Sequence, residues 1–537
     1  MDVLIRDGRL VDGTGNPWSY ADVGITGDRV TRVAPAGRLD PRTAETVVDA
    51  TGLVVCPGFI DIQSHSILPL LSDGRSLSKV TQGVTTEIMG ELWTPAPFGG
   101  KRVAPVLPGF GEITPEDEER ARGWTRFAAW LDHVAARGAS VNFGSFLGGA
   151  TVREYAMGWA MGEASPDALN RMRQVVAEAM ADGAFGIAPA LIYPPNAYSS
   201  DEELIACAEV VGRSGGRYIV HLRSEGERFL ESLAATIDLG RRAGVAVEIY
   251  HLKVTGRPYW SKMPGAIALI DRARADGVDV TATMYPYVAS GTGLAAALPD
   301  WAQADGKLVE NLRDPATRAR IREGILAPSS RGSLAGPEGI LVVGLRRPEN
   351  RRWNGRTIAQ IAAERERDWP DTLMDLVESE GPWASANYFL MSEENLTLQM
   401  RQPWITFSTD APGVDPANPG GILVHPRAYG TYPRILGSYV RDQQVIPLED
   451  AIRKMTSAVA SRLGLRDRGQ VQPGFFADVV VFDPNVVSDR ASFADPHQLS
   501  VGVRDVWVNG QQVLANGVHT GARPGRPVYG PGRGNGA

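Results

Sequence analysis

The amino-acid sequence predicts an α/β protein, a (β/α)8 TIM-like barrel with a small β-sandwich built from both ends of the chain. Three observations favour this fold class. Short β-branched segments separated by Asp-Gly and Gly-Asp turns occupy both ends of the chain. Between them, eight short apolar segments alternate with amphipathic helical patterns, which is typical of a parallel barrel. The length of 537 residues is sufficient for a large barrel plus a second domain.

The two terminal regions predict the sandwich. Residues 1–54 form its N-terminal part and residues 466–519 its C-terminal part, because both read as strands broken by tight turns. Residues 520–537 are rich in Gly, Pro and Arg and contain little to bury. We expect them to drape over a surface or to stay mobile.

The middle of the chain, residues 55–465, predicts the barrel. Its eight candidate strands are 55–62, 84–89, 141–147, 185–191, 218–222, 245–252, 278–285 and 404–408. An insertion at about 289–386 breaks the rhythm with far more than one helix. In such a barrel a long insertion after a strand lies over the active site, so we expect a lid, with a plain surface subdomain as the alternative.

Composition excludes several classes of function. A net charge of −7 and a pI of about 5.7 argue against a nucleic-acid partner, which would need a basic face. No apolar run approaches the roughly 20 residues that cross a bilayer, and no signal peptide is visible at the start. Two cysteines without CxxC spacing favour reduced thiols. We therefore expect a cytoplasmic protein without a membrane partner, and leave open whether it forms a homo-oligomer.

Three histidines and one aspartate mark the candidate site. His65, His221 and His251 lie at or just past the ends of candidate strands, and Asp410 ends another. Catalytic residues of these barrels gather at the carboxyl ends of the strands. Imidazoles with carboxylates suit zinc, whereas packing in the core is the alternative for any single histidine. The pattern therefore predicts a metal site, with zinc as the ion.

Ten short motifs spread along the whole chain make the hypothesis specific. They are PGFID at 57–61, QGVTT at 82–86, LIYPP at 191–195, HLRSE at 221–225, HLK at 251–253, YPY at 285–287, STD at 408–410, HPR at 425–427, GTYPR at 430–434 and GFFAD at 474–478. Together they resemble the D-aminoacylases (N-acyl-D-amino-acid deacylases) of the amidohydrolase superfamily. The resemblance implies the same barrel, sandwich and lid, and zinc-dependent hydrolysis of a linear amide, with an N-acyl amino acid, expected to be of D configuration, as the small-molecule partner.

The chain departs from the family at two metal-site positions. Where the family has His-x-His, this chain has Gln63 before His65, and where the family supplies a cysteine it has Leu92, with Glu91 beside it. A carboxylate can bind zinc and leucine cannot. We therefore expect one tight zinc on Glu91, His221 and His251. A second, weaker ion near His65, Asp410 and Gln63 is an alternative, as is a Glu91 that bridges two ions.

The remaining roles follow from the resemblance and from reach. Asp410 is expected to take a proton from water and pass it to the departing amine. The family's lysine, tyrosine and arginine, which hold the amino-acid carboxylate, correspond here to Lys253, to Tyr285 or Tyr287, and to Arg427, with surface cations as the alternative.

Two other interpretations stay open on the sequence alone. The altered metal ligands could accompany another substrate, such as a dipeptide, a cyclic amide or a specialised natural-product amide. A non-catalytic barrel used as a scaffold is the second, although it gives no reason to keep His221, His251 and Asp410 together.

Overall fold

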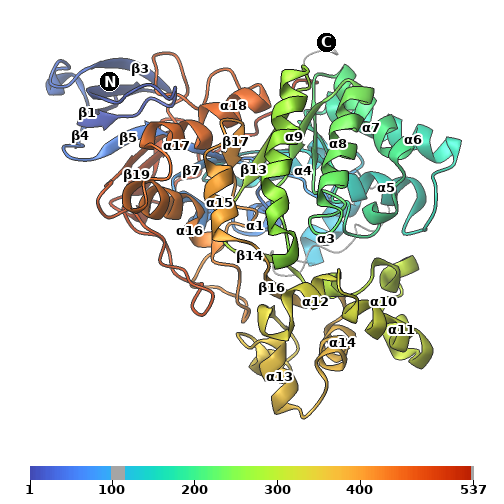
Figure 1. The fold of residues 1–537 in the computed structure, drawn as a ribbon. Coiled ribbons are helices and arrows are strands. Elements are labelled where there is room, and N and C mark those ends of the chain that lie inside the picture. The colour runs from blue at the N-terminus through green and yellow to red at the C-terminus, as the bar shows by residue number, and fades with distance from the viewer. Residues whose placement is uncertain (98–114, 534–537) are drawn as a thin grey trace.

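The structure, a computed structural model, describes residues 1–97 and 115–533. It contains the barrel and the sandwich that the sequence predicts, and a third lobe built from the long insertion. Figure 1 shows the sandwich and the insertion projecting from different sides of the barrel. The site described below lies between the barrel and the insertion.

Within the described residues, eight parallel strands form the barrel. They run in the order β6 (Phe59–Asp61), β7 (Val84–Met89), β8 (Asn142–Ser145) with its continuation β9 (Leu147–Gly148), β10 (Gly186–Ala188), β11 (Arg217–Val220), β12 (Ala246–Ile249), β13 (Val280–Met284) and β17 (Ile405–Phe407). A parallel bridge between Ser64 and Ala411 joins the last strand back to the first. The closed ring brings the carboxyl ends of all eight strands to one rim.

Helices cover the outside of the ring because their apolar residues recur on one face. Helix α7 begins after Ser200, whose side chain accepts from the backbone N–H of Glu203, and α8 ends at Gly244 in the left-handed conformation. The helices around the barrel are α1 (Ile67–Ser72), α2 (Leu77–Val80), α3 (Pro115–Arg122), α4 (Ala128–Arg137), α5 (Gly149–Met157), α6 (Pro166–Ala181), α7 (Asp201–Arg213), α8 (Phe229–Ala243), α9 (Met263–Ala275), α15 (Glu393–Met400), α16 (Arg427–Arg434), α17 (Leu448–Met455) and α18 (Ser457–Leu463).

The sandwich is a nine-stranded sheet contributed by both ends of the chain. Strand β5 pairs antiparallel with β18 and so joins the two halves. Ile5 and Val23 from one half share a buried cluster with Val479 and Trp507 from the other. The strands are β1 (Val3–Leu10), β2 (Ser19–Thr26), β3 (Arg29–Pro35), β4 (Thr46–Asp49), β5 (Val54–Pro57), β18 (Val479–Phe482), β19 (Val503–Val508), β20 (Gln511–Ala515) and β21 (Val518–His519). The predicted segment 55–62 is therefore two strands, of which β5 belongs to the sandwich and β6 to the barrel.

The insertion carries its own core and sheet. Strands β14 (Ala289–Gly293), β16 (Ser385–Phe389) and β15 (Ile340–Gly344) form an antiparallel sheet in that order. Its helices are α10 (Leu308–Arg313), α11 (Pro315–Leu326), α12 (Arg331–Ala335), α13 (Ile358–Glu364) and α14 (Trp369–Glu380). They appear in yellow tones below the barrel in Figure 1. Because β14 directly follows a barrel strand, the insertion stands at the rim where the site lies.

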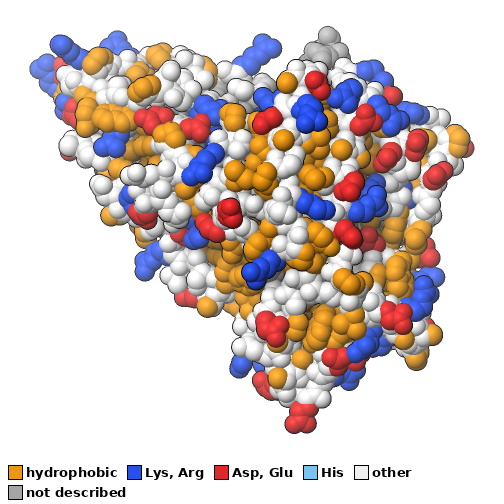
Figure 2. All heavy atoms as spheres, viewed as in Figure 1, with side chains coloured by type: hydrophobic (Ala, Val, Ile, Leu, Met, Phe, Trp, Pro, Cys, Tyr) orange, Lys and Arg blue, Asp and Glu red, His pale blue; other side chains and the backbone are white. Residues whose placement is uncertain are grey.

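The C-terminal segment lies along the barrel as far as it is described. Phe143 donates its backbone N–H to Arg526, and Val528 donates its own back to Phe143. Residues 534–537 of the predicted tail lie outside the described residues. Among the described residues, no helix is both long and apolar enough to cross a bilayer. Figure 2 shows acidic and basic side chains interspersed over the face drawn there.

Candidate active site

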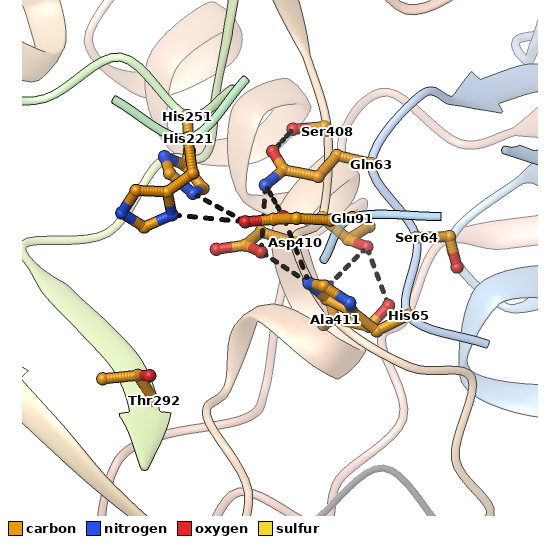
Figure 3. Close-up of polar contacts among 12 residues, drawn as sticks. Gln63, Ser64, His65, Glu91, His221, His251, Thr292, Ser408, Asp410 and Ala411 are labelled. Atoms are coloured by element: carbon orange, nitrogen blue, oxygen red, sulfur yellow. Dashed lines mark hydrogen bonds and ion pairs between the residues drawn. The ribbon is translucent and has the colours of Figure 1, made fainter. Parts of the chain in front are cut away.

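The predicted site residues meet at the carboxyl rim of the barrel. All of them except Gln63 and Tyr287 line one cavity of about 950 Å³, counted with its open mouth, which falls within the usual range for small-molecule sites. His65 follows β6, Glu91 follows β7, His221 follows β11, His251 follows β12 and Asp410 follows β17. Figure 3 shows these side chains converging, with Glu91 between the pair of histidines on one side and His65 on the other.

Unusual backbone conformations aim several of these side chains. His251, Asp410 and Leu92 have φ values of 35°, 50° and 66°, which non-glycine residues rarely adopt. Tertiary hydrogen bonds hold them: the N–H of His251 donates to the Thr283 hydroxyl at 2.7 Å, and the N–H of Asp410 donates to the Gln63 carbonyl at 2.9 Å. Such conformations cost roughly 1–3 kcal/mol each and concentrate at functional sites.

Glu91, His221 and His251 form a first ligand group, whose ligand atoms all lie within 4.8 Å of one another. Glu91 Oε1 is 3.2 Å from His221 Nδ1 and 3.6 Å from His251 Nε2. Two ligands at about 2.0–2.1 Å from a tetrahedral zinc are roughly 3.3 Å apart. The spacing and the nitrogen and oxygen donors therefore fit zinc.

His65, Glu91 and Asp410 form a second ligand group with the same property. His65 Nε2 lies 2.9 Å from Asp410 Oδ1 and 3.6 Å from Glu91 Oε2. Gln63 behaves differently from a ligand. Its amide nitrogen donates to Glu91 at 2.7 Å and to Asp410 at 3.1 Å, while its oxygen accepts from Thr283 and Ser408. In this hydrogen-bond network Gln63 ties the two carboxylates together, and a second ion near His65, Asp410 and Gln63 stays a prediction.

Glu225 supports both histidines of the first ligand group from behind. Its Oε1 lies 3.4 Å from His221 Nε2, 3.4 Å from His251 Nδ1 and 2.5 Å from the ammonium of Lys253. A carboxylate on the second nitrogen fixes ring orientation and strengthens the first nitrogen as a ligand. Lys253 itself is buried and also contacts His251 Nδ1 at 2.6 Å, so it stands beside the histidines.

The pKa values of the two imidazoles shift in opposite directions. Burial lowers the pKa of His221 to about 4 against the pull of Glu225. Burial and Lys253 also act to lower the pKa of His251, but Asp410, Glu225 and Glu91 outweigh them and raise it to about 9. Burial acts to raise the pKa of Glu91, yet its contacts with the histidines hold that pKa well below the ordinary value. The site therefore favours a neutral His221 and a charged His251 beside an ionised Glu91.

Asp410 is held in its ionised form. Its Oδ2 lies 2.6 Å from Nη1 of Arg427, and its Oδ1 contacts His65 and Gln63. Burial acts to raise the pKa of Asp410, but Arg427, His251 and His65 outweigh it, so the pKa lies below the ordinary value. A buried carboxylate that stays ionised can accept a proton.

Tyr285 lies between the two predicted cations. The Arg427 guanidinium is 4.7 Å and the Lys253 ammonium 5.9 Å from the centroid of its ring. Its hydroxyl is buried and has no hydrogen-bond partner among the described residues. Tyr287 lies elsewhere, packed against Arg434 and Phe493 and outside the lining of the cavity. The geometry therefore favours Tyr285 over Tyr287 for contact with a ligand.

His425, the first residue of the HPR motif, holds Arg427 in place. Its Nδ1 accepts from the backbone N–H of Arg427 at 3.0 Å, and its Nε2 donates to the carbonyl of Ala289 at 2.9 Å. The contact joins the start of the insertion to the start of α16, whose first residue is Arg427. Both ring nitrogens are thereby used.

A buried lysine beneath the rim was not found from the sequence. Lys79 is fully buried, and its ammonium donates to Asp61 at 2.6 Å and to the carbonyl of Ala411 at 2.7 Å. Asp61 in turn accepts from the N–H of Thr409 at 3.0 Å. The cluster ties down the residues on either side of Asp410.

The insertion supplies one wall of the cavity. Ser290, Thr292, Arg331 and Asn387 come from it and line the cavity together with the barrel residues. Arg331 could not be assigned to the site from the sequence, because the insertion lacks the alternation of strands and helices that locates the other site residues.

Comparison with known proteins gives consistent results. A model described as "Amidohydrolase family" matches residues 356–514. The chain is 35% identical over 527 residues to the D-aminoacylase of Alcaligenes xylosoxydans xylosoxydans, covering 98% of this chain and 97% of that protein. It is 32% identical to the N-acyl-D-aspartate deacylase of the same organism, over 99% of this chain and 95% of that one. A crystal structure of N-acyl-D-glutamate deacylase from Bordetella bronchiseptica, complexed with zinc and a phosphonate mimic of the tetrahedral intermediate, aligns with a TM-score of 0.80 at 28% identity, over 98% of this chain and 99% of the other.

Proposed function

This chain belongs to the D-aminoacylase family of amidohydrolases, and from that premise we propose that it is a zinc-dependent hydrolase that removes the acyl group from N-acyl-D-amino acids. One observation carries the proposal: a zinc-compatible ligand group lines the same cavity as two cations and a phenol that has no hydrogen-bond partner among the described residues. A metal site beside an anion site is what hydrolysis of an acylated amino acid requires.

Zinc is proposed to bind the first ligand group, Glu91, His221 and His251. The second ligand group could hold a further ion, with Glu91 shared between the two. When bound, zinc polarises the amide carbonyl and lowers the pKa of water toward about 7. Glu225 would keep both imidazoles turned toward Glu91, because it contacts their outer nitrogens.

Asp410 is proposed to move the proton. It accepts a proton from the attacking water, whose oxygen adds to the carbonyl carbon. As the carbon–nitrogen bond breaks, Asp410 returns that proton to the departing nitrogen, which leaves a carboxylic acid and a free amino acid. The contacts of Asp410 with Arg427 and His65 support this role, since they favour its ionised form.

The substrate carboxylate is proposed to bind between Arg427, Lys253 and Tyr285. The Arg427 guanidinium can donate two parallel hydrogen bonds to a carboxylate. The phenol of Tyr285 can donate a further one, because it has no hydrogen-bond partner among the described residues. Burial lowers the pKa of Lys253, while the neighbouring carboxylates of Glu225 and Asp410 favour its charged form. A substrate whose carboxylate is bound here would have its amide next to the two ligand groups.

Product analysis on matched N-acetyl-D- and N-acetyl-L-amino acids tests the proposal with the zinc-loaded protein. We expect free D-amino acid and acetate, and little turnover of the L series. Hydrolysis confined to dipeptides or cyclic amides would show that the substrate is not an N-acyl amino acid. Loss of all hydrolysis at full zinc occupancy would favour a scaffold and refute the proposal.

A further inference from the structure

One wall of the cavity gathers hydrogen-bond donors around a cation. Arg331 begins α12 and reaches the cavity with a side chain that is 14% exposed. It donates to the Ser290 hydroxyl at 3.4 Å, and its guanidinium lies 5.5 Å from the centroid of the Tyr388 ring. In the same wall the hydroxyls of Tyr193 and Thr292 are 2.7 Å apart.

This polar wall adjoins the histidines of the first ligand group. The ring of Tyr193 lies 5.4 Å from that of His221, centroid to centroid. Thr292 projects from β14 on the same side of the cluster as His221 and His251 in Figure 3. A group bound against Arg331 would therefore belong to a molecule whose amide is at the ligand groups.

Arg331 is the least compensated cation of the described cavity lining. Lys253 has Glu225 at 2.5 Å and Arg427 has Asp410 at 2.6 Å. The nearest carboxylate oxygen of Arg331 is Glu225 Oε2 at 3.9 Å, and the charge of Glu225 is already shared with Lys253. Burial raises the pKa of Asp300, and the charge of Arg331 acts to lower it. No ion pair between described residues joins Asp300 and Arg331.

The described lining also contains a group of apolar side chains. Its members are Val343, Ala386, Pro412, Leu423 and Val424. The cavity thus combines apolar side chains suited to a hydrocarbon chain with a polar group around Arg331 suited to an anion. A substrate with a single carboxylate would occupy the cradle of Arg427 and leave the wall around Arg331 without a partner of opposite charge.

We propose that Arg331 is a specificity-determining residue that binds a second carboxylate of the substrate, so that the preferred substrates are N-acyl amino acids carrying two carboxylates. The inference rests on the proposed function and names its substrate class. The second carboxylate belongs either to an acidic amino-acid side chain or to a dicarboxylic acyl group, and the same guanidinium chemistry serves both.

Paired substrates, of which one carries the second carboxylate and the other lacks it, test the proposal by their kcat/KM. The side-chain arm compares N-acetyl-D-glutamate with N-acetyl-D-glutamine, and the acyl arm compares N-succinyl-D-leucine with N-butanoyl-D-leucine. We expect the acidic member of one pair to be favoured by about 10- to 150-fold, the range that a hydrogen bond to a charged group provides. The arm that shows the preference identifies the source of the carboxylate.

Variants assign the preference to Arg331. Arg331→Met should remove most of the preference, and Arg331→Lys should restore part of it because the charge returns without the planar fork. Arg320→Met is the matched control, since Arg320 lies in the same insertion against Trp301 and outside the cavity. A wild-type enzyme that shows no preference for either acid, or an equal loss on both members of a pair in Arg331→Met, would overturn the proposal.

A binding measurement separates this inference from the proposed function. If the zinc-loaded protein hydrolyses no member of the panel, the proposed function fails. Calorimetric titration with both members of each pair then still decides the role of Arg331. Tighter binding of the acidic member of one pair that is lost in Arg331→Met supports an anion site, and equal binding within both pairs overturns it.

Discussion

Replacement of Arg427 by methionine should affect both substrate binding and the chemical step, because this one guanidinium serves two partners. It contacts Asp410 at 2.6 Å, donates to the carbonyl of Gly291 at 3.1 Å, and is only 3% exposed. Loss of a hydrogen bond to a charged group costs about 1.5–3 kcal/mol, which corresponds to a rise in KM of roughly 10- to 150-fold for a carboxylate substrate. Asp410 also loses its neighbouring cation, so kcat should fall as well.

A pair of substrates separates the two effects. Steady-state kinetics would compare an N-acetyl-D-amino acid with its C-terminal carboxamide, which lacks the negative charge. For Arg427→Met we expect the rise in KM on the acid alone and a fall in kcat by a common factor on both. An equal rise in KM on acid and carboxamide would refute the carboxylate cradle. An unchanged kcat on the carboxamide would refute the link to Asp410.

Three further substitutions test the other parts of the site. Asp410→Asn should lower kcat by about 10²- to 10⁴-fold, because an amide cannot accept the proton. Zinc content, measured in parallel, should stay unchanged, since Asp410 does not belong to the first ligand group. Wild-type turnover would contradict the role of Asp410. Loss of a residue that only contacts a metal ligand lowers metal affinity by up to roughly 100-fold. Glu91→Gln should lower zinc affinity by more than this, as measured by competition with a chelator. Unchanged affinity would show that Glu91 is not a ligand. Lys79→Met leaves Asp61 buried without its cation and should cost about 3–5 kcal/mol of unfolding free energy, seen as a lower urea midpoint. The exposed control Lys307→Met should leave that midpoint unchanged, and an equal midpoint in both variants would contradict the account.

Much of the fold could be predicted because it depends on local pattern. Apolar strands that alternate with amphipathic helices indicate a parallel barrel, and the strand-end positions of His221, His251 and Asp410 follow from that pattern. The boundary at Pro57 was less visible, since β5 and β6 are both apolar and only Gly58 separates them. Their different partners, β18 and β7, depend on contacts made far away in the sequence.

The parts of the site that escaped prediction depend on tertiary contact. The pairing of Arg427 with Asp410 and the approach of Arg331 to Glu225 join segments that no spacing rule connects. The amide of Gln63 could be recognised as an unusual residue at that position, but its orientation is determined by Thr283 and Ser408. The positive φ of His251 likewise depends on contacts with a neighbouring strand, and the residue type at this position does not predict it.

Zinc titration of the metal-free protein tests the central claim most directly. Activity on an N-acetyl-D-amino acid should rise with added zinc and level off near one equivalent bound per chain, because the first ligand group is complete in Glu91, His221 and His251. A plateau reached only at two equivalents would contradict a single activating ion. Full turnover without bound metal would contradict the account as a whole.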